Sequence, residues 1–245
     1  MHFALYAFTG ERMDLPLKNS FDEIFSQLTL TGPHLQTGLP KKVLFWGEGA
    51  GEISSYVSGW MGGKGIDVIV LDGANRFDPY VVSSFAKKAL IPPEHLLKRI
   101  RIARAFTSYQ MATLVGEKLP SLLGTELQKP WVIFLGLITT FLDEDVPERE
   151  VRPLFERSLR KIEEMAEGGI PFFLFQPSAF SKNFPFSKGG VGGSKGSKRA
   201  YLMRRLFQFS NEVWRISLED QEPRLFLEKK LEKHQTPSTN HQIMT

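Results

Sequence analysis

A glycine-rich segment directly after the apolar run Val43–Phe45 has nearly the spacing of a phosphate-binding loop. Such a loop reads G-x-x-x-x-G-K-[ST]: its backbone N–H groups surround the phosphates, the Lys neutralises them and the hydroxyl binds Mg²⁺. In this chain Glu52 stands in place of the Lys, Ile53 in place of the Ser or Thr, and Trp46 in place of the first Gly. The candidate residues of this degenerate nucleotide-binding loop are Gly47, Gly49, Gly51, Glu52 and Ile53.

The binding energy lost when Glu52 replaces the Lys is large enough to prevent ordinary ATP binding. A Lys about 4 Å from a phosphate charge gains on the order of 4 kcal/mol at an effective dielectric near 20, and a Glu loses a similar amount. Each ~1.4 kcal/mol is a tenfold change in affinity. We therefore expect no ordinary ATP binding unless Glu52 turns outward or another cation, such as Lys64, reaches the loop. The alternative interpretation is a plain Gly-rich turn between a strand and a helix.

A second segment, from Lys182 to Arg199, combines cations, aromatic residues and flexible glycines. Single-stranded nucleic acid is bound by cations that follow the backbone and by aromatic side chains that stack on bases. The segment is therefore a candidate DNA-binding loop, and the alternative is a surface loop whose lysines favour solubility. The candidate DNA-binding residues are Lys182, Lys188, Lys195, Lys198 and Arg199.

Apolar runs alternate with helical patterns along most of the chain, which predicts an α/β fold with a parallel sheet and helices on both faces. From Leu206 to Ile216 and from Pro223 to Leu231 the apolar residues alternate with polar ones, which predicts a C-terminal antiparallel hairpin. We expect strands at Lys42–Trp46, Ile66–Asp72, Ile100–Phe106, Trp131–Ile138 and Ile170–Gln176. We expect helices at Ile53–Met61, from the turn at Asn75–Pro79 to Leu90, after a cap at Thr107 or Ser108, and at Glu150–Glu167.

The composition is that of a soluble globular protein, with 245 residues, 42% hydrophobic residues and 24% charged residues. We expect a single domain over residues 1–231 and a polar tail over 232–245. The chain has no cysteine, which excludes disulfides and thiolate metal sites, and its five histidines are scattered, so we expect no metal site. There is no signal-peptide pattern and no run near the ~20 apolar residues that span a bilayer, so we expect a cytoplasmic protein without membrane association.

The order of these parts resembles the RecA/RadA recombinase ATPase core. The segments Val70–Pro79 and Arg101–Gln110 are similar to segments that this family carries at its second and third core strands. Phe175 and Gln176, followed by the Lys182–Arg199 segment, match its switch glutamine and its second DNA-binding loop. The resemblance covers roughly Asp22 to Glu228. It implies a RecA-like P-loop NTPase fold, with a mostly parallel central sheet flanked by helices and a C-terminal antiparallel hairpin.

The departures from this family fall on its catalytic positions. Ala74 stands where the family carries the glutamate that polarises water, and the run Val132–Leu135 leads into Gly136 instead of an Asp that supports magnesium. Together with Glu52 and Ile53, these changes remove the electrostatic groups on which phosphoryl transfer depends. The resemblance therefore implies a pseudo-ATPase with no catalytic residues, no metal and no required cofactor, in which ATP and Mg²⁺ are disfavoured.

Several carboxylates and one amide leave alternatives open. Asp72, or one of Asp143, Glu144 and Asp145, could act as a displaced carboxylate, and the alternative for the acids from Asp143 onward is a solvated loop and a first helical turn, which favours acids. Gln176 is a switch-like residue, or else a side chain at a strand end that bonds to neighbouring backbone.

These patterns predict a DNA recombination or repair accessory protein that binds single-stranded DNA or a RecA-family recombinase without hydrolysing ATP. The first alternative is a DNA-dependent ATPase with rerouted catalytic residues. The second is a protein-interaction scaffold. Homo-oligomers stay open, although no Phe-x-x-Ala segment of the kind that connects the family's filaments is present.

Overall fold

The computed structural model describes residues 4–6, 12–14, 25, 41–126, 128–178, 199–219 and 222–230. Four of the predicted DNA-binding residues, Lys182, Lys188, Lys195 and Lys198, lie outside the described residues, as does the predicted tail, 232–245.

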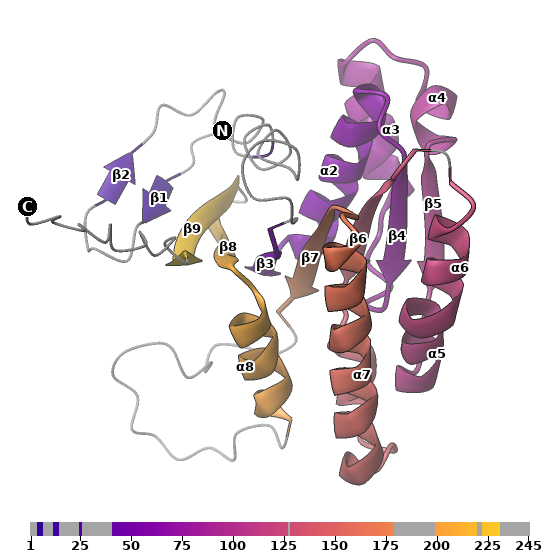
Figure 1. Ribbon diagram of the computed structural model, residues 1–245. Helices are drawn as coiled ribbons and strands as arrows, with labels where there is room; N and C mark the ends of the chain where they lie inside the picture. The colour runs from indigo at the N-terminus through magenta and orange to yellow at the C-terminus, as the bar shows by residue number, and fades with distance from the viewer. Residues whose placement is uncertain are drawn as a thin grey trace, which may run out of the picture.

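A seven-stranded sheet in the order β5-β4-β6-β7-β3-β8-β9 forms the centre of the molecule (Figure 1). The neighbours from β5 to β8 pair in parallel, and β8 and β9 form an antiparallel hairpin, so the predicted sheet type and the predicted hairpin are confirmed. A short antiparallel pair, β1 (Ala4–Tyr6) and β2 (Arg12–Asp14), lies next to β9. The strands are β3 (Val43–Gly47), β4 (Val68–Asp72), β5 (Ile100–Arg104), β6 (Trp131–Leu135), β7 (Phe172–Pro177), β8 (Glu212–Glu219) and β9 (Glu222–Lys230).

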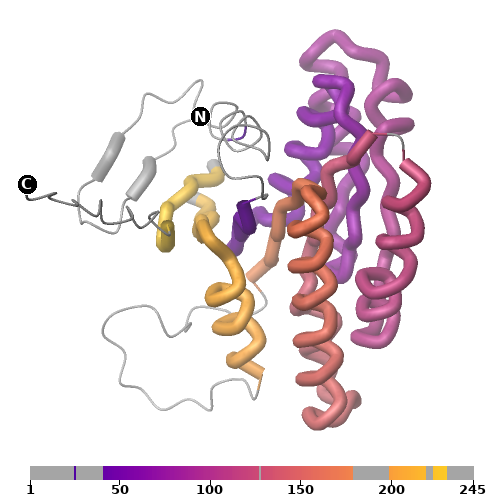
Figure 2. The backbone as a smooth tube through the Cα atoms, viewed as in Figure 1, coloured from indigo at the N-terminus to yellow at the C-terminus, as the bar shows by residue number. Residues whose placement is uncertain are grey.

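Helices cover both faces of the sheet, as the alternating pattern predicts (Figures 1 and 2). One face carries α2 (Ala50–Gly63), α3 (Pro79–Lys88) and α4 (Pro93–Leu97). The other carries α5 (Ser108–Thr113), the π-helical turn η1 (Leu114–Lys118), α6 (Leu119–Leu123), the 3-10 turn η2 (Thr139–Leu142), α7 (Glu148–Glu167) and α8 (Ala200–Phe209).

The core is divided by the sheet because successive side chains of a strand point to opposite faces. On β3, Val43 and Phe45 pack toward α2, and Leu44 packs toward α7 and α8. The Phe45 ring lies 5.0 Å from Phe175 and 5.1 Å from Phe25, measured between centroids. Both faces of the central strands are buried, which explains their nearly continuous apolar runs.

Local capping signals set the start of two helices at the carboxyl ends of the strands. The Asp78 side chain accepts the N–H of Tyr80 at the start of α3, at 2.8 Å. The Thr107 hydroxyl accepts the N–H of Gln110 at 3.2 Å, which confirms Thr107 as the cap of α5. Side-chain acceptors at these positions satisfy donors that the first turn of a helix leaves free.

The predicted strand from Leu206 is wrong in its first part. Helix α8 continues to Phe209, and β8 begins only at Glu212. Buried Leu202, Met203 and Leu206 repeat every three or four residues, which is the spacing of one helical face. The apolar residues from Leu206 onward belong first to the buried face of α8 and then to β8, and together they resemble the alternation of one strand.

Candidate functional site at the carboxyl edge of the sheet

The glycine-rich segment forms a very short connection between β3 and α2. Strand β3 ends at Gly47 and α2 begins at Ala50, so only Glu48 and Gly49 lie between them. A Cβ atom at Gly47, whose φ is +124°, would lie 2.1 Å from the carbonyl oxygen of Ile216 in β8. Gly49 has a left-handed φ of 82° at the N-cap of α2. These two glycines therefore serve a close strand contact and a sharp turn.

The two residues that replace the nucleotide-binding side chains point in different directions. Glu52 is exposed in the first turn of α2, where a negative charge interacts favourably with the helix dipole. Ile53 is 5% exposed and packs in the core, and its N–H donates to the Gly49 carbonyl at 2.9 Å. Glu52 thus turns outward, which is one of the two ways around charge inversion that the sequence left open.

The second way, through Lys64, is wrong. Lys64 follows the last residue of α2, a helix of 14 residues, and so lies at the opposite end from the glycine turn. Its Nζ atom lies 4.0 Å from the centroid of the Trp60 ring. The cationic residue that does come next to the first turn is Arg76, whose Cβ atom would lie 2.8 Å from a Cβ on Gly51. Sequence reasoning missed Arg76 because the contact depends on how the turn after β4 packs on α2.

The turns after β4 and β6 pack directly against each other. A Cβ atom at Gly136, whose φ is +68°, would lie 2.4 Å from the Cβ of Ala74. The Gly73 N–H donates to the Leu135 carbonyl at 2.8 Å, and a Cβ at Gly73 would lie 2.8 Å from the Gly136 oxygen. Ala74 and Gly136 are the two positions where the resemblance implies a glutamate and an aspartate. They touch, and this leaves no room there for a side chain on Gly136.

Asp72 shapes the turn after β4 and is not free to act as a displaced carboxylate. Its side chain is fully buried. One oxygen accepts the N–H groups of Ala74 at 3.1 Å and Arg76 at 3.2 Å, and the other accepts the N–H of Phe77 at 3.0 Å. The Nε atom of Arg104 lies 3.6 Å from the second oxygen. A carboxylate bonded to this many donors is a structural anion of the turn.

Arg199 requires a correction, because the structure gives it a structural position in place of the predicted DNA contact. It is 7% exposed and stands at the N-cap of α8. Its guanidinium donates to the carbonyl oxygens of Phe141 at 2.6 Å, Val146 at 2.5 Å, and Asp143. Its Nε atom also lies 3.4 Å from the Glu148 carboxylate. The planar fork of Arg fits several acceptors at once, so Arg199 holds the connection between β6 and α7.

Gln176 is bonded to the same connection. It is 3% exposed. Its Oε1 atom accepts the Ile138 N–H at 3.1 Å, and its Nε2 atom donates to the Thr139 hydroxyl at 3.2 Å and to the Pro177 carbonyl at 3.2 Å. These contacts match the alternative interpretation, in which a strand-end amide bonds to its neighbours. The assignment of donor and acceptor follows from this network.

The acidic segment after β6 is a turn before α7. The Asp143 carboxylate accepts the Asp145 N–H at 3.1 Å, while Glu144 and Asp145 are exposed. Within the part of the chain that the structure describes, no group of three or more His, Asp or Glu side chains could hold a metal ion. These contacts match the solvated-turn alternative.

Trp46, in place of the first glycine of the loop, packs on the face of the sheet that α8 covers. Its ring lies 5.5 Å from that of Phe207 in α8, between centroids, and its indole N–H donates to the Glu228 carboxylate at 2.9 Å. Glu228 also accepts from Arg215 at 3.0 Å. Burial raises the pKa of Glu228, and the hydrogen bonds from Trp46 and Arg215 oppose that rise. Sequence reasoning missed this cluster, since Trp46 and Glu228 meet only across β3, β8 and β9.

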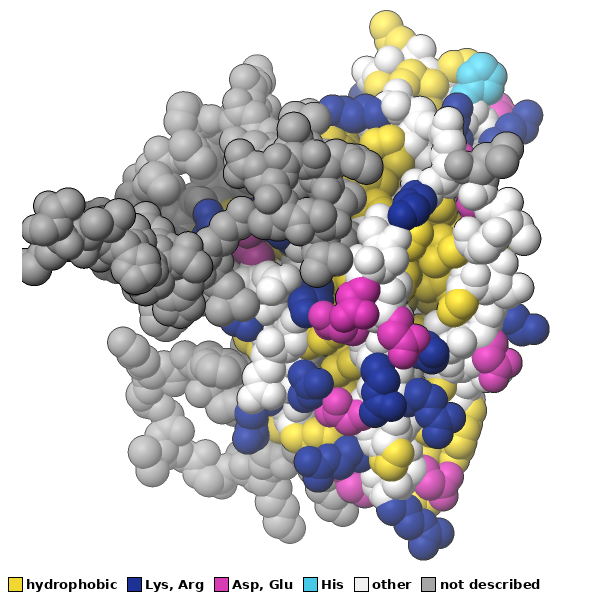
Figure 3. Space-filling view, in the orientation of Figure 1, with side chains coloured by type: hydrophobic (Ala, Val, Ile, Leu, Met, Phe, Trp, Pro, Cys, Tyr) yellow, Lys and Arg dark blue, Asp and Glu magenta, His cyan; other side chains and the backbone are white. Residues whose placement is uncertain are grey.

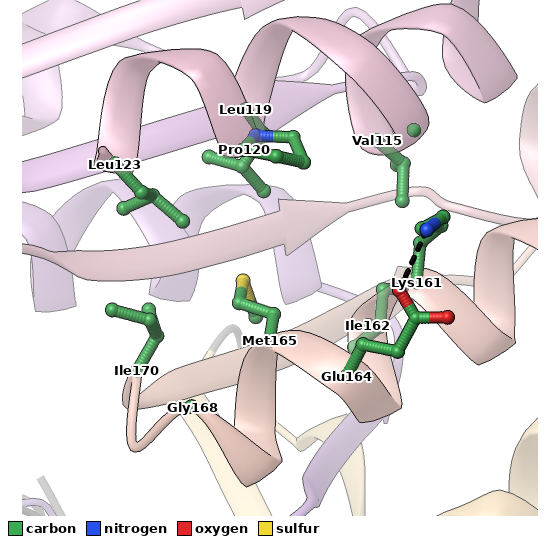
Figure 4. Close-up of a pocket in the computed structure, with 11 residues that line it drawn as sticks. Val115, Leu119, Pro120, Leu123, Lys161, Ile162, Glu164, Met165, Gly168 and Ile170 are labelled. Atoms are coloured by element: carbon green, nitrogen blue, oxygen red, sulfur yellow. Dashed lines mark hydrogen bonds and ion pairs between the residues drawn. The ribbon is translucent and has the colours of Figure 1, made fainter. Parts of the chain in front are cut away.

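A pocket of about 250 Å³ lies elsewhere, between α6 and α7 (Figure 4). Leu119 and Pro120 form one wall, and Ile162 and Met165 form the other. An ion pair of 2.6 Å joins Lys161 and Glu164 at one end. Ile170, just before β7, also lines the pocket. The pocket therefore lies near the amino end of that strand and is separate from the carboxyl edge.

No protein-family model matches the chain, and no curated protein matches it. In the described ranges, from 41 to 126 and beyond, no helix has the length and apolar character needed to cross a membrane.

Proposed function

We propose that this chain is a RecA-like module that binds single-stranded DNA, or a RecA-family recombinase, in DNA recombination or repair and does not hydrolyse ATP. The observation that carries the loss of hydrolysis is the contact between Ala74 and Gly136. The resemblance to the RecA/RadA core implies a water-activating glutamate and a metal-supporting aspartate at these two positions, and here Ala and Gly stand there in contact.

The short glycine turn supports the same proposal. A phosphate-binding loop needs room and free backbone donors around the phosphates. Here the turn contains only Glu48 and Gly49, and Gly51 packs against the backbone of Arg76. Glu52 adds a negative charge to the solvent side of the same helical turn.

The Lys-rich segment, Lys182–Arg199, supports the DNA-binding part of the proposal through its composition and through the described residues Ser178, which precedes it, and Arg199, which ends it. The Ser178 N–H donates to the Gly47 carbonyl at 3.2 Å, and Arg199 is fixed to the connection between β6 and α7. The described residues on either side of 179–198 are thus fixed at the carboxyl edge. Lysines on such a segment supply the salt-dependent contacts that hold a nucleic-acid backbone.

The test is fluorescence anisotropy of the full chain with a labelled oligothymidylate at several salt concentrations. Replacing Lys182, Lys188, Lys195 and Lys198 by Ala is expected to weaken binding at least about tenfold and to flatten its salt dependence. The matched control replaces four exposed lysines away from the segment, Lys87, Lys88, Lys98 and Lys118, by Ala, with the same change of charge. Undetectable binding by the unmodified chain, or equal losses in the two variants, would contradict the DNA-binding role.

Thermal melting with and without Mg-ATP separates the proposal from a DNA-dependent ATPase with rerouted residues. A ligand at about 100 times its dissociation constant adds roughly 2.7 kcal/mol to stability. We expect no shift at millimolar Mg-ATP. A clear shift, together with DNA-stimulated phosphate release, would favour the ATPase.

A further inference from the structure

Three aromatic side chains are exposed on neighbouring turns at the carboxyl edge. In the described part of the chain, Tyr80 is 82% exposed, Phe106 66% and Tyr109 47%. Strands β4 and β5 pair side by side, with Asp72 opposite Arg104. Tyr80 follows the turn after β4, and Phe106 and Tyr109 follow β5 directly. Burial of an aromatic ring is favourable, so several exposed rings at one edge indicate a contact surface.

The backbone around these rings is held in place. The Tyr80 N–H donates to Asp78 at 2.8 Å. The Phe106 N–H donates to the Gln110 side chain at 2.8 Å, and the Tyr109 hydroxyl donates to the Glu150 carboxylate. The rings are therefore presented by ordered turns, and a partner that packs on them loses less conformational entropy on binding.

Two arginines lie at the same turns. Arg76 is exposed in the turn after β4. Arg104 keeps 44% of its side chain exposed and donates to the Phe77 carbonyl at 3.4 Å, which joins the ends of β4 and β5. The Asp72 carboxylate is fully buried and lies 3.6 Å from the Arg104 Nε atom, so it offsets part of the charge of Arg104 without being exposed itself. On the side of the glycine turn, the exposed Glu48 and Glu52 carry negative charge, so the positively charged area ends there.

We infer that Tyr80, Phe106, Tyr109, Arg76 and Arg104, here called the aromatic–arginine surface, bind single-stranded nucleic acid. Bases stack on Tyr80 and Phe106, and the two arginines pair with phosphates. Proteins that bind single strands without sequence preference use this combination of stacking rings and cations. The inference rests on the proposed function and names a second contact for the same strand.

The position of the surface favours nucleic acid over a protein partner, for which Tyr and Arg are also suited. Ser178, which precedes the Lys-rich segment, and Arg199, which ends it, are both fixed at the same sheet edge. The front of the molecule around α7 instead shows Lys and Arg interspersed with Asp and Glu (Figure 3). A strand that passes Ser178 and Arg199 at this edge can continue onto the aromatic–arginine surface without crossing that mixed face.

The test compares two double variants of the full chain with a labelled oligothymidylate. Loss of one stacked base typically weakens binding about 5- to 150-fold. Tyr80→Ser with Phe106→Ser is expected to weaken binding at least about 20-fold with an unchanged salt slope, while Arg76→Gln lowers the slope by about 0.7. The matched control, Leu90→Ser with Leu97→Ser, removes exposed apolar side chains at the α3–α4 end and is expected to leave binding unchanged. Melting temperatures within about 2 °C of the unmodified chain show that the variants are folded.

Photo-crosslinking gives an independent measurement. An oligonucleotide with 5-iodouracil is expected to crosslink to peptides that contain Tyr80 or Phe106, as mapped by mass spectrometry. If the lysine variant weakens binding and the Tyr80/Phe106 variant does not, the inference is overturned and the proposed function stands. If only the Tyr80/Phe106 variant weakens binding, the inference stands and the role of the lysines is overturned. If that variant keeps DNA binding but loses a protein captured by the unmodified chain, the surface is a protein interface and the inference is overturned.

Discussion

Two neighbouring parts of the carboxyl edge differ in how they use their side chains. From the end of β4 and the first residues after it (72–74) across β6, β7 and β3, the turns are packed against each other. Residue types capable of chemistry are bonded there to backbone: Gln176 to Ile138, and Arg199 to Phe141 and Val146. At the start of α3 and directly after β5, Tyr80 and Phe106 are exposed instead of packed in the core. The carboxyl edge of a parallel sheet is where ligands usually bind. In this protein the packed part contains Gln176 and Arg199, which the sequence predicts as site residues. The exposed part contains Tyr80 and Phe106, which it does not.

The difference follows from the cost of burying polar groups. Turns at a sheet edge contain backbone N–H and C=O groups that the sheet itself does not pair. Each such group costs about 1–3 kcal/mol if it is buried without another partner. Asp72 and Arg199 satisfy such groups in the packed part. A reactive residue type is therefore weak evidence of a ligand site until its hydrogen bonds are known. Several exposed aromatic rings at one edge are stronger evidence, because exposed apolar patches mark interaction sites.

Replacing Gly136 by Ala is expected to have the largest effect, because it forces open the packed part. The left-handed φ of 68° costs a non-Gly residue about 1–2 kcal/mol, and the contact with Ala74 adds about 1–3 kcal/mol. The control is Gly65→Ala, where φ is +80° but nothing lies within 4 Å of the new Cβ. Urea denaturation is expected to show the φ cost alone for Gly65→Ala. Equal losses in the two variants would show that the Ala74 contact is not tight.

Replacing Arg199 by Ala is expected to destabilise the protein by about 2–4 kcal/mol, because the carbonyl groups of Phe141, Asp143 and Val146 lose their donor. Arg204, exposed on the same helix, serves as the control, and Arg204→Ala is expected to stay within about 0.5 kcal/mol. The measurement is the midpoint and slope of urea unfolding. A variant that kept full stability and lost DNA binding would restore Arg199 to the predicted DNA contact.

Glu228 gives a smaller, pH-dependent effect. Burial raises its folded-state pKa above the ordinary value of 4.5, so folding strengthens proton binding at this carboxyl. The stabilisation from this group is fully present below the unfolded pKa and is lost as the pH rises through the folded pKa. Between about pH 4 and pH 7, the unmodified chain is therefore expected to lose stability relative to Glu228→Gln. Denaturation at the two pH values measures this difference, and a constant or opposite difference would contradict the assignment.

The smallest effect on stability is expected in the exposed part. Tyr80→Ser and Phe106→Ser are expected to change the free energy of unfolding by no more than about 0.5 kcal/mol each, because neither ring packs in the core. Urea denaturation of the single variants measures it. A loss above about 1.5 kcal/mol in either would show that its ring supports the turn, and the contrast between the two parts of the edge would disappear.

The sequence by itself determined the sheet type, most of the strands and most of the helices around them, but not α4 or α8. Continuous apolar runs such as Trp131–Leu135 and the amphipathic pattern of α7 have few other stable arrangements. It also determined that the nucleotide-binding side chains of the loop are missing, because Glu52 and Ile53 are read directly from the chain. The boundary between α8 and β8 was missed, since apolar residues in both periods run together from Leu206.

Only the tertiary structure decided what the remaining polar residues do. Arg199 reads as one more cation of a basic segment, and its burial depends on a turn more than 50 residues earlier in the chain. Arg76 and Tyr80 follow β4 and Phe106 follows β5, and they come to one edge because β4 and β5 pair in parallel. Hydrogen bonds and exposure are properties of groups brought together in space, so local pattern predicts the elements but not which side chains they leave for a partner.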